Sequence, residues 1–111
     1  MPHATAMGSG TQAALDCHTV CLETVTHCLT KGGDHARPDH IVLLLDCAEI
    51  CQTAANFMTR DSELHGLTCR VCAEICESCA QSCEQLGDDD EMRRCAEACR
   101  RCAESCRAMA A

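Results

Sequence analysis

The chain has 111 residues, 14 of them cysteine and only one aromatic, Phe57, and its formal net charge is −8. Leucine, isoleucine, valine and phenylalanine together make up about 15% of it, a composition typical of disordered chains unless the cysteines themselves form the core. The acidic balance argues against a nucleic-acid partner. The longest apolar run, Ile41–Leu45, is far too short to span a membrane.

Residues 1–10 are predicted to form a flexible N-terminal tail. They contain no basic region followed by a hydrophobic stretch, so we expect no secretory signal and a cytoplasmic protein. Thiols stay reduced in the cytosol, and many reduced thiols in one chain favour metal binding.

Four helices are expected along the rest of the chain, which we predict to be a single domain, residues 11–111. The first runs over 11–31 and ends at two glycines, and the second runs over 38–59 with Pro38 in its first turn. Asp61 or Ser62 is predicted to cap a third helix that ends near Leu86. The acidic run 88–91 precedes a fourth helix that reaches about residue 109, because negative charge is favourable at a helix N-terminus.

Short links between helices of similar length predict antiparallel neighbours, and hence an all-α, antiparallel up-down-up-down four-helix bundle. The cysteine spacing supports helices, since every gap between successive cysteines of one segment is 3, 4 or 7 residues. This is the spacing of the stripe that a helix turns toward a bundle core. The cysteines on these inward stripes are Cys17, Cys21, Cys28, Cys47, Cys51, Cys69, Cys72, Cys76, Cys79, Cys83, Cys95, Cys99, Cys102 and Cys106.

The motif Cys-Ala-Glu-x-Cys occurs four times, at residues 47–51, 72–76, 95–99 and 102–106. Its alanine is small and a strong helix former, which lets neighbouring helices approach closely. Its glutamate falls outside the cysteine stripe, and we expect it to be exposed to solvent.

Three uses of these thiols are disfavoured. As plain packing residues they would leave an underfilled core. A disulfide framework requires an oxidising compartment, and stacked cysteines would pair degenerately. The CxxC pairs resemble zinc half-sites, but four thiolates per ion would accommodate about three zinc ions and leave roughly eight buried negative charges. An iron–sulfur spacing is absent.

Monovalent copper fits the pattern best. Soft thiolates select Cu(I), and a thiolate that bridges two ions allows about one ion per cysteine, so that the positive and negative charges cancel. A linear S–Cu–S unit spans about 4.5 Å if its bonds are roughly 2.3 Å long, as for zinc. Residues at i and i+4 of a helix have Cβ atoms about 5–6 Å apart, which small rotamer changes accommodate.

The chain resembles the bacterial copper storage proteins, in particular their cytosolic branch. The resemblance rests on the repeated motif, on the segment from Asp46 to Met58 and on the cysteine-rich last two helices, and it covers about residues 11–111. It implies a bundle whose core holds many Cu(I) ions, and it implies a homotetramer. The first two helices carry fewer cysteines than those of the richer family members, so a lower capacity is expected.

Further ligands are predicted where the cysteine stripes end. Continuing the spacing leads to His40, His65, Met58 and Met92, whose imidazole and thioether groups suit Cu(I), and also to Met109. Met58, His65 and Met109 are expected at one end of the bundle, and His40 and Met92 at the other, near Cys28, Cys83 and Cys95. Their alternative roles are core packing for methionine and solvated helix ends for histidine. His18 and His27 point away from the stripe, and His35 lies in a loop.

The sequence therefore predicts a cytosolic storage and detoxification protein for Cu(I) rather than an enzyme, because no single cysteine is distinguished as a reactive thiol. A zinc or mixed-metal buffer resembling metallothionein is the alternative. Ile41–Leu45 is apolar all round the helix, so part of it is expected to face a neighbouring subunit.

Overall fold

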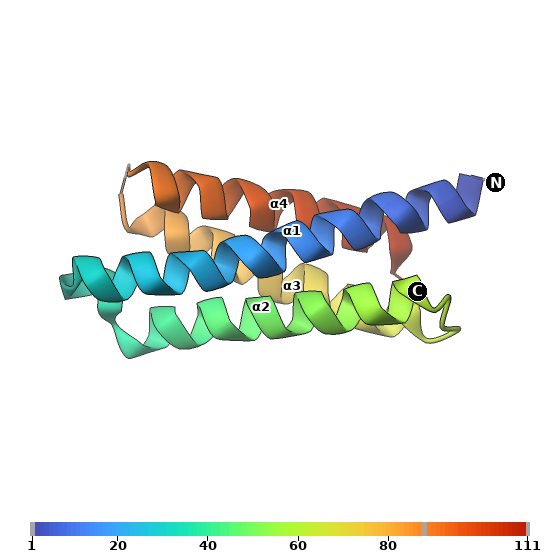
Figure 1. Ribbon diagram of the computed structural model, residues 1–111, viewed down its shortest axis with the longest axis horizontal. Coiled ribbons are helices and arrows are strands. Elements are labelled where there is room, and N and C mark those ends of the chain that lie inside the picture. The colour runs from blue at the N-terminus through green and yellow to red at the C-terminus, as the bar shows by residue number, and fades with distance from the viewer. Residues whose placement is uncertain (1, 88, 111) are drawn as a thin grey trace.

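The computed structural model describes residues 2–87 and 89–110, and within them four long α-helices form an antiparallel bundle (Figure 1). The helices are α1 (Pro2–Lys31), α2 (Pro38–Thr59), α3 (His65–Gln85) and α4 (Asp90–Met109). A short 3-10 helix, η1 (Gly33–Ala36), lies in the link between α1 and α2. This confirms the predicted all-α, up-down-up-down fold.

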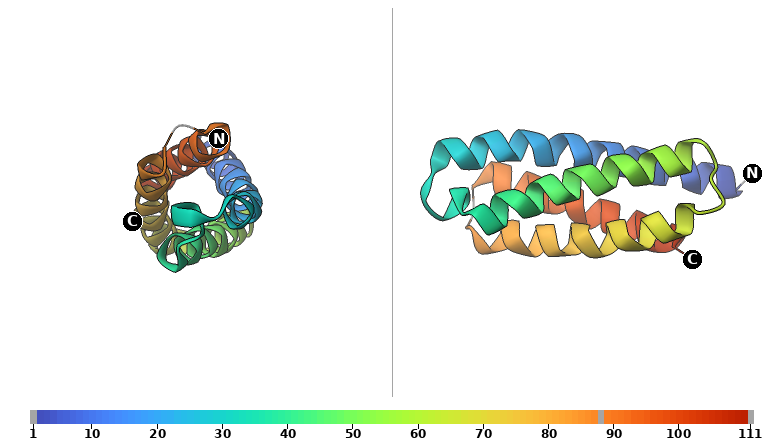
Figure 2. Two further views of the ribbon diagram at one scale, coloured as in Figure 1. Left: turned by 90° about the vertical axis from the view of Figure 1, so that its left-hand side faces the viewer. Right: turned by 90° about the horizontal axis from the view of Figure 1, so that it is seen from below.

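Each helix packs against two neighbours: α1 against α2 and α4, and α3 against the same two helices. Viewed along the bundle, the four helices form a ring, and the α1–α2 link lies across one end of it (Figure 2). The chain termini and the α2–α3 link lie at the opposite end. The bundle is 46 Å long, close to the length of roughly 45 Å that a helix of 30 residues such as α1 has at 1.5 Å per residue.

Most predicted helix boundaries are confirmed. Helix α1 stops where Gly32 and Gly33 adopt positive φ angles of 76° and 58°, a backbone region that glycine enters without steric cost. Pro38 occupies the first turn of α2. Asp89 caps α4, because its carboxylate accepts a hydrogen bond of 2.8 Å from the backbone N–H of Met92. Asp88 belongs to the predicted acidic run but lies outside the described residues.

The predicted N-terminal tail is wrong for residues 2–10, which continue α1 instead of preceding it. Pro2 suits the first turn of a helix, and Met7 is 6% exposed, so the additional turns bury apolar surface. Gly10 leaves room for Met58, whose Sδ lies 3.1 Å from where a Cβ would be. Met1 lies outside the described residues.

The predicted cap of the third helix is also wrong, because α3 begins later, at His65, after Leu64. Asp61 has a positive φ of 53° and turns the chain, and the Ser62 hydroxyl accepts a hydrogen bond from the N–H of Leu64 within the link. Both side chains therefore shape the turn that precedes the helix.

Helix α2 is, by length and composition, apolar enough to cross a membrane. The same test is passed by core helices, and α2 contributes fully buried side chains to the bundle, among them Leu44, Cys47 and Cys51. This single helix is weak evidence for a membrane span.

Candidate metal centre

The centre of the bundle is lined by sulfur. All 14 cysteines are 0% exposed, and all are free thiols. The predicted direction of the cysteine stripes is thus confirmed on all four helices. The remaining space is taken largely by alanines, including Ala48, Ala73, Ala96 and Ala103 of the repeated motif. The motif glutamates Glu49, Glu74, Glu97 and Glu104 are exposed, as predicted.

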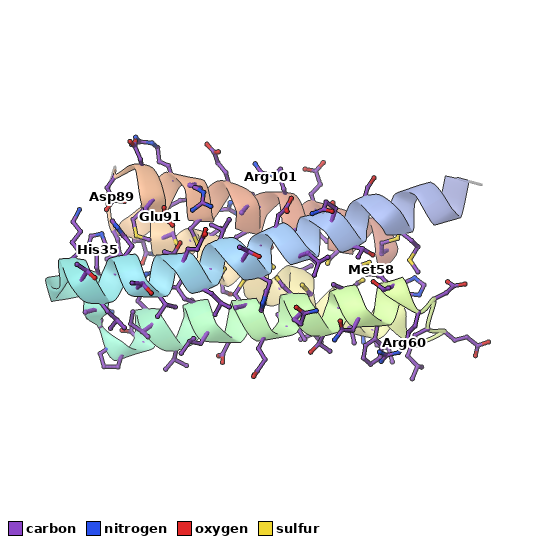
Figure 3. All side chains as sticks on the ribbon, viewed as in Figure 1. His35, Met58, Arg60, Asp89, Glu91 and Arg101 are labelled. Carbon is purple, nitrogen blue, oxygen red and sulfur yellow. The ribbon has the colours of Figure 1, made fainter. Side chains whose placement is uncertain are left out.

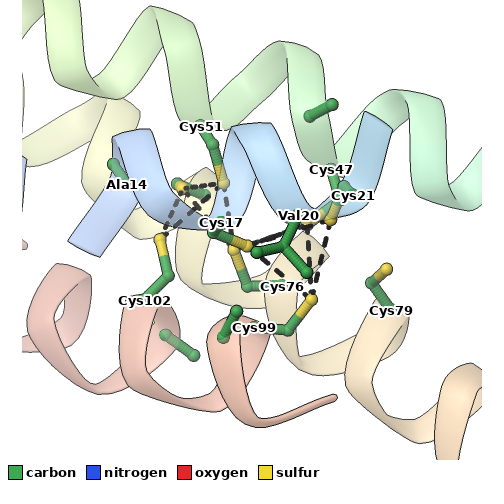
Figure 4. Packing of buried hydrophobic residues seen from close by; sticks show 14 of the residues in the cluster. Ala14, Cys17, Val20, Cys21, Cys47, Cys51, Cys76, Cys79, Cys99 and Cys102 are labelled. Carbon is green, nitrogen blue, oxygen red and sulfur yellow. Dashed lines mark hydrogen bonds between the residues drawn. The ribbon is translucent and has the colours of Figure 1, made fainter. Parts of the chain in front are cut away.

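Thiols from different helices meet in the core, as the close-up in Figure 4 shows. The sulfur of Cys99 lies 3.7 Å from that of Cys17 and 3.9 Å from that of Cys47, so α4 contacts α1 and α2. The sulfur of Cys51 lies 3.5 Å from that of Cys76 and 3.7 Å from that of Cys102, which joins α2 to α3 and α4. Sulfur–sulfur contacts of this kind join thiols of all four helices into one array.

Four groups of four thiols have all their sulfur atoms within 4.8 Å of one another. The groups share members, and each of them overlaps at least one other. Cys17 and Cys47, for example, each belong to two groups. The groups are Cys17, Cys21, Cys47 and Cys99; Cys17, Cys47, Cys51 and Cys76; Cys21, Cys79, Cys95 and Cys99; and Cys51, Cys72, Cys76 and Cys102.

The end of the bundle near the α1–α2 link holds the first predicted set of additional ligands. His40 is 3% exposed, and its Nε2 lies 3.5 Å from the sulfur of Cys28. The sulfur of Met92 lies 3.7 Å from the same thiol. The predicted gathering of His40 and Met92 near Cys28 is therefore present.

Hydrogen bonding and burial favour the neutral form of the His40 ring. Its Nδ1 is hydrogen-bonded to the hydroxyl of Ser82 at 2.7 Å, and with the ring proton on Nδ1 the lone pair of Nε2 faces Cys28. Burial lowers the pKa of His40, which favours the neutral ring. Burial, followed by the nearby negative charges of Cys95 and Asp89, raises the pKa of Cys28 to about 11.

The opposite end holds the second predicted set. Met58 is 3% exposed, and its Sδ and the Cγ of Met109 lie 3.1 Å and 3.7 Å from where a Cβ on Gly10 would be. His65 begins α3 at this end, with its Nδ1 2.7 Å from the carbonyl oxygen of Ser62. Figure 3 places Met58 at the end of the bundle opposite to His35 and Asp89.

His18, His27 and His35 lie outside the thiol array. His18 points off the stripe, as predicted, but it is half-buried between helices, with its Nδ1 2.7 Å from the carbonyl oxygen of Ala48. His27, predicted to point away from the stripe, and His35, predicted to lie in a loop, both contact Asp89. This contact was missed in the sequence, although the end of α1 and the start of α4 must share one end of an antiparallel bundle.

The fold and the site together define a four-helix bundle with a metal-binding core of thiols. Residues 3–111 match the model of the copper storage protein family. The chain belongs to this family.

Solved structures of high similarity cover nearly the whole chain. The Nmul_A1745 protein of Nitrosospira multiformis is 46% identical, with a TM-score of 0.90, over 96% of this chain and 95% of that one. The Cu(I)-bound copper storage protein BsCsp3 is 38% identical, with a TM-score of 0.88, over 96% of this chain and 99% of that one. A cytosolic copper storage protein from Streptomyces lividans, described with five coppers, is 25% identical with a TM-score of 0.83, over 96% and 93%.

A cysteine-rich protein of Bacillus subtilis, YhjQ, described as uncharacterized, is 40% identical over 64 residues. The aligned segment spans 58% of this chain and 59% of that protein.

Proposed function

We propose that this protein stores Cu(I) ions in the core of the bundle, with the 14 cysteine thiolates as ligands. The observation that carries the proposal is the complete burial of all 14 thiols, together with the sulfur–sulfur contacts that join thiols of all four helices. Family membership and the Cu(I)-bound relative BsCsp3 support it. Reversible binding in such an array provides both storage and detoxification, because bound Cu(I) is withdrawn from solution.

The sulfur spacing supports ions shared between thiolates. Observed sulfur–sulfur distances of 3.5–4.0 Å are close to the separation of about 4.0 Å that three thiolates adopt around one ion with bonds of roughly 2.3 Å. Linear coordination would require about 4.5 Å, which small rotamer changes provide. Because neighbouring groups of thiols share members, a sulfur that serves one ion is also placed to serve the next.

The same overlap argues against zinc. Only two of the four groups of thiols can be occupied at once without sharing a cysteine, and two zinc tetrathiolate sites would use eight cysteines and leave six of the 14 without an ion. Each such site would also carry a net negative charge inside the core, which is costly to bury. A zinc or mixed-metal buffer therefore fits the array less well than Cu(I).

His40, Met92, Met58 and His65 are proposed as ligands at the two ends of the array. The contacts of Cys28 with His40 Nε2 and Met92 Sδ support a mixed thiolate, imidazole and thioether site at one end. At the other end, the burial of Met58 beside Met109 and the position of His65 at the start of α3 support the assignment.

Anaerobic titration of the reduced protein with Cu(I), in competition with a chromophoric chelator, tests the proposal. A plateau at about one copper per cysteine is expected, because each thiolate bridges two ions. Saturation at three or four ions, or a preference for zinc in the same competition, would replace Cu(I) storage by the zinc buffer.

The proposal is storage in the cytoplasm rather than catalysis. The thiols are all buried, whereas a redox enzyme exposes one activated cysteine to its substrate. The net charge of −8 disfavours nucleic-acid partners, and no membrane partner is proposed. The relative from Streptomyces lividans is described as cytosolic, which supports the compartment. We also propose that the four helices form a single metal-binding domain.

A homotetramer is also proposed, supported by an exposed apolar stripe across α1 and α2. Leu22, Leu29, Val42 and Leu45 are between 43% and 56% exposed. Leu22 and Leu45 line one groove between the two helices. Leu29 lies seven residues after Leu22 on α1, and Val42 lies three residues before Leu45 on α2, so both extend the same stripe along the helices. Exposed apolar surface of this kind is typical of an interface.

Sedimentation equilibrium tests the subunit contact. Leu45→Glu should lower the mass below that of a tetramer, because a charge would be buried in the contact. Leu67→Glu, at a leucine of α3 that is 46% exposed, is the matched control and should leave the mass unchanged. A monomeric wild-type protein would contradict the proposal.

A further inference from the structure

Outside the thiol array, two histidines and an aspartate converge at the end of the bundle near the α1–α2 link. The Nε2 atoms of His27 and His35 lie 3.3 Å and 3.1 Å from the same oxygen, Oδ2 of Asp89. The three ligand atoms all lie within 4.8 Å of one another. They come from α1, η1 and the residue that caps α4, and Figure 3 shows His35 and Asp89 at this end.

Two of the three distances between these atoms match the edge of a tetrahedral metal site. Zinc bonds to imidazole nitrogen and carboxylate oxygen measure about 2.0–2.1 Å, so two ligands of a tetrahedron lie about 3.3 Å apart. Both nitrogen–oxygen distances are close to this value. The side chains of His27, His35 and Asp89 are 33%, 12% and 23% exposed, which leaves access for an ion and for water as a fourth ligand.

The aspartate is held in place independently of any ion. Its other oxygen, Oδ1, accepts the hydrogen bond from the Met92 N–H that caps α4, and this leaves Oδ2 directed toward the two rings. Burial raises the pKa of Asp89, but the Met92 amide, Lys31 and the two imidazoles together hold that pKa below its usual range. The carboxylate is therefore charged at neutral pH and available as a ligand.

Lys31 competes with a metal ion for this oxygen. Its Nζ lies 2.9 Å from Oδ2 of Asp89, and its side chain is 47% exposed. The ammonium group occupies the position of a cation at the site, and its exposure allows it to move into solvent when an ion binds.

We infer that His27, His35 and Asp89 form a second metal site, on the outside of the bundle, for a divalent ion of the zinc class. Nitrogen and oxygen ligands of this kind suit borderline divalent ions, whereas the core thiolates select Cu(I). The site would join the end of α1 and the α1–α2 link to the start of α4. It does not depend on copper storage, because no ligand is shared with the thiol array.

The experiment uses full-length, reduced protein that has been loaded with Cu(I) under anaerobic conditions, so that the thiols are occupied. Equilibrium dialysis against Zn²⁺ with analysis of both metals should show one zinc per chain and no loss of copper. Nitrogen NMR of the imidazole rings should show shifts at His27 and His35 and none at His18. Failure of copper loading would appear in the copper count and can be distinguished from failure of zinc binding.

Ligand substitutions locate the ion. His27→Gln and His35→Gln should each weaken zinc binding by at least about 10–100-fold. Replacing a residue that only hydrogen-bonds to a metal ligand already costs this much affinity, and here the ligand itself is removed. His18→Gln is the control, because His18 is also a half-buried histidine of α1 but contacts the carbonyl of Ala48. Circular dichroism and copper capacity should be unchanged in all three variants.

Lys31→Gln provides a test in which zinc binding is expected to become stronger rather than weaker. Removing the competing ammonium group should strengthen zinc binding about two- to fivefold at low ionic strength, the size of an exposed ion pair. The inference is overturned if the wild type binds no zinc, if the double variant His27→Gln/His35→Gln binds it equally well, or if zinc uptake only displaces copper. An unchanged affinity of Lys31→Gln would also overturn it.

Discussion

At the scale of single residues, Cys99 illustrates how one thiol serves several neighbours. Its sulfur lies 3.7 Å from that of Cys17 and 3.9 Å from those of Cys21 and Cys47. A thiolate at this position is placed to bridge ions held by α1 and by α2. Individual cysteines are therefore expected to affect capacity without any one being indispensable, in contrast to the nucleophile of an enzyme.

Cys99→Ser should lower the Cu(I) plateau by about one ion per chain, because a hydroxyl is a poor ligand for this soft metal. The plateau is measured in the anaerobic chelator competition. His18→Gln is the control and should keep the full plateau, since His18 contacts the carbonyl of Ala48 and lies off the cysteine stripe. Equal losses in both variants would contradict the assignment of the inward face.

Cys28 predicts a loss of stability of the metal-free protein at alkaline pH. Its pKa in the folded state is about 11, against 9.0 for an unperturbed thiol. The folded state therefore keeps its proton where the unfolded state has lost it. The stability contributed by Cys28 is fully present below pH 9.0 and is lost as the pH rises toward about 11.

At pH 10 the expected loss from this one residue is about 1 kcal/mol. Urea unfolding of reduced, metal-free protein at pH 8 and pH 10 measures it. Cys28→Ala is the matched variant and should lose less stability between the two pH values, because it has no thiol to ionise. An identical loss in wild type and variant would show that the pKa of Cys28 is not raised in the folded protein.

At the scale of the elements, α1 differs most from the sequence prediction, since its helix begins at Pro2 rather than at Thr11. The residues that the sequence predicts to form a tail include Gly8 and Gly10, and glycine lowers helix propensity. Packing outweighs this cost, because Met7 is 6% exposed and Gly10 lies against Met58. The extension therefore covers one end of the core.

Gly8→Ala should stabilise the protein by up to about 1 kcal/mol, because alanine is the better helix former. No atom lies within 4 Å of where the new Cβ would be, so the substitution introduces no clash. Chemical unfolding and helicity by circular dichroism measure the effect. Gly32→Ala is the control in the opposite direction. Because φ is 76° at Gly32, a side chain there is strained although no other group lies nearby, and a loss of stability is expected. A Gly8→Ala variant of unchanged stability would favour a flexible tail.

At the scale of the whole molecule, the core consists mainly of sulfur and alanine methyl groups rather than large apolar side chains. Leu44 and Met92 are the largest of the fully buried residues. Such a core buries little apolar surface per residue, which limits the stability of the metal-free bundle. Bound ions would add bonds between all four helices, because thiols of all four helices contact one another in the array.

Loading with Cu(I) should raise the melting temperature, since a ligand that binds the folded state preferentially stabilises it by mass action. Helix content should change little, because copper binds side-chain sulfur and leaves the backbone hydrogen bonds of the helices in place. Thermal unfolding followed by circular dichroism compares the two forms. A variant in which both Cys17 and Cys99 are replaced by serine should show a smaller rise. Identical melting with and without copper would contradict binding in the core.

The amino-acid sequence by itself determined the four helices, the inward direction of all 14 cysteines and the exposure of the motif glutamates. These follow from the period of 3.6 residues per turn, which is a local property of a helix and can be read along a single segment. Most helix ends could also be predicted from the sequence, because Gly32, Pro38 and the acidic residues before α4 act within a turn of their own position.

Only the tertiary structure decided which thiols of different helices meet, where α1 begins and where α3 starts. The tertiary structure also brought His27 and His35, which lie 62 and 54 residues from Asp89 in the sequence, into contact with that residue. Such contacts depend on how far each helix slides and rotates against its neighbours, and this register is set by the packing of all four helices together. A cysteine stripe thus indicates a metal-binding core, whereas the geometry of each site emerges from the assembled bundle.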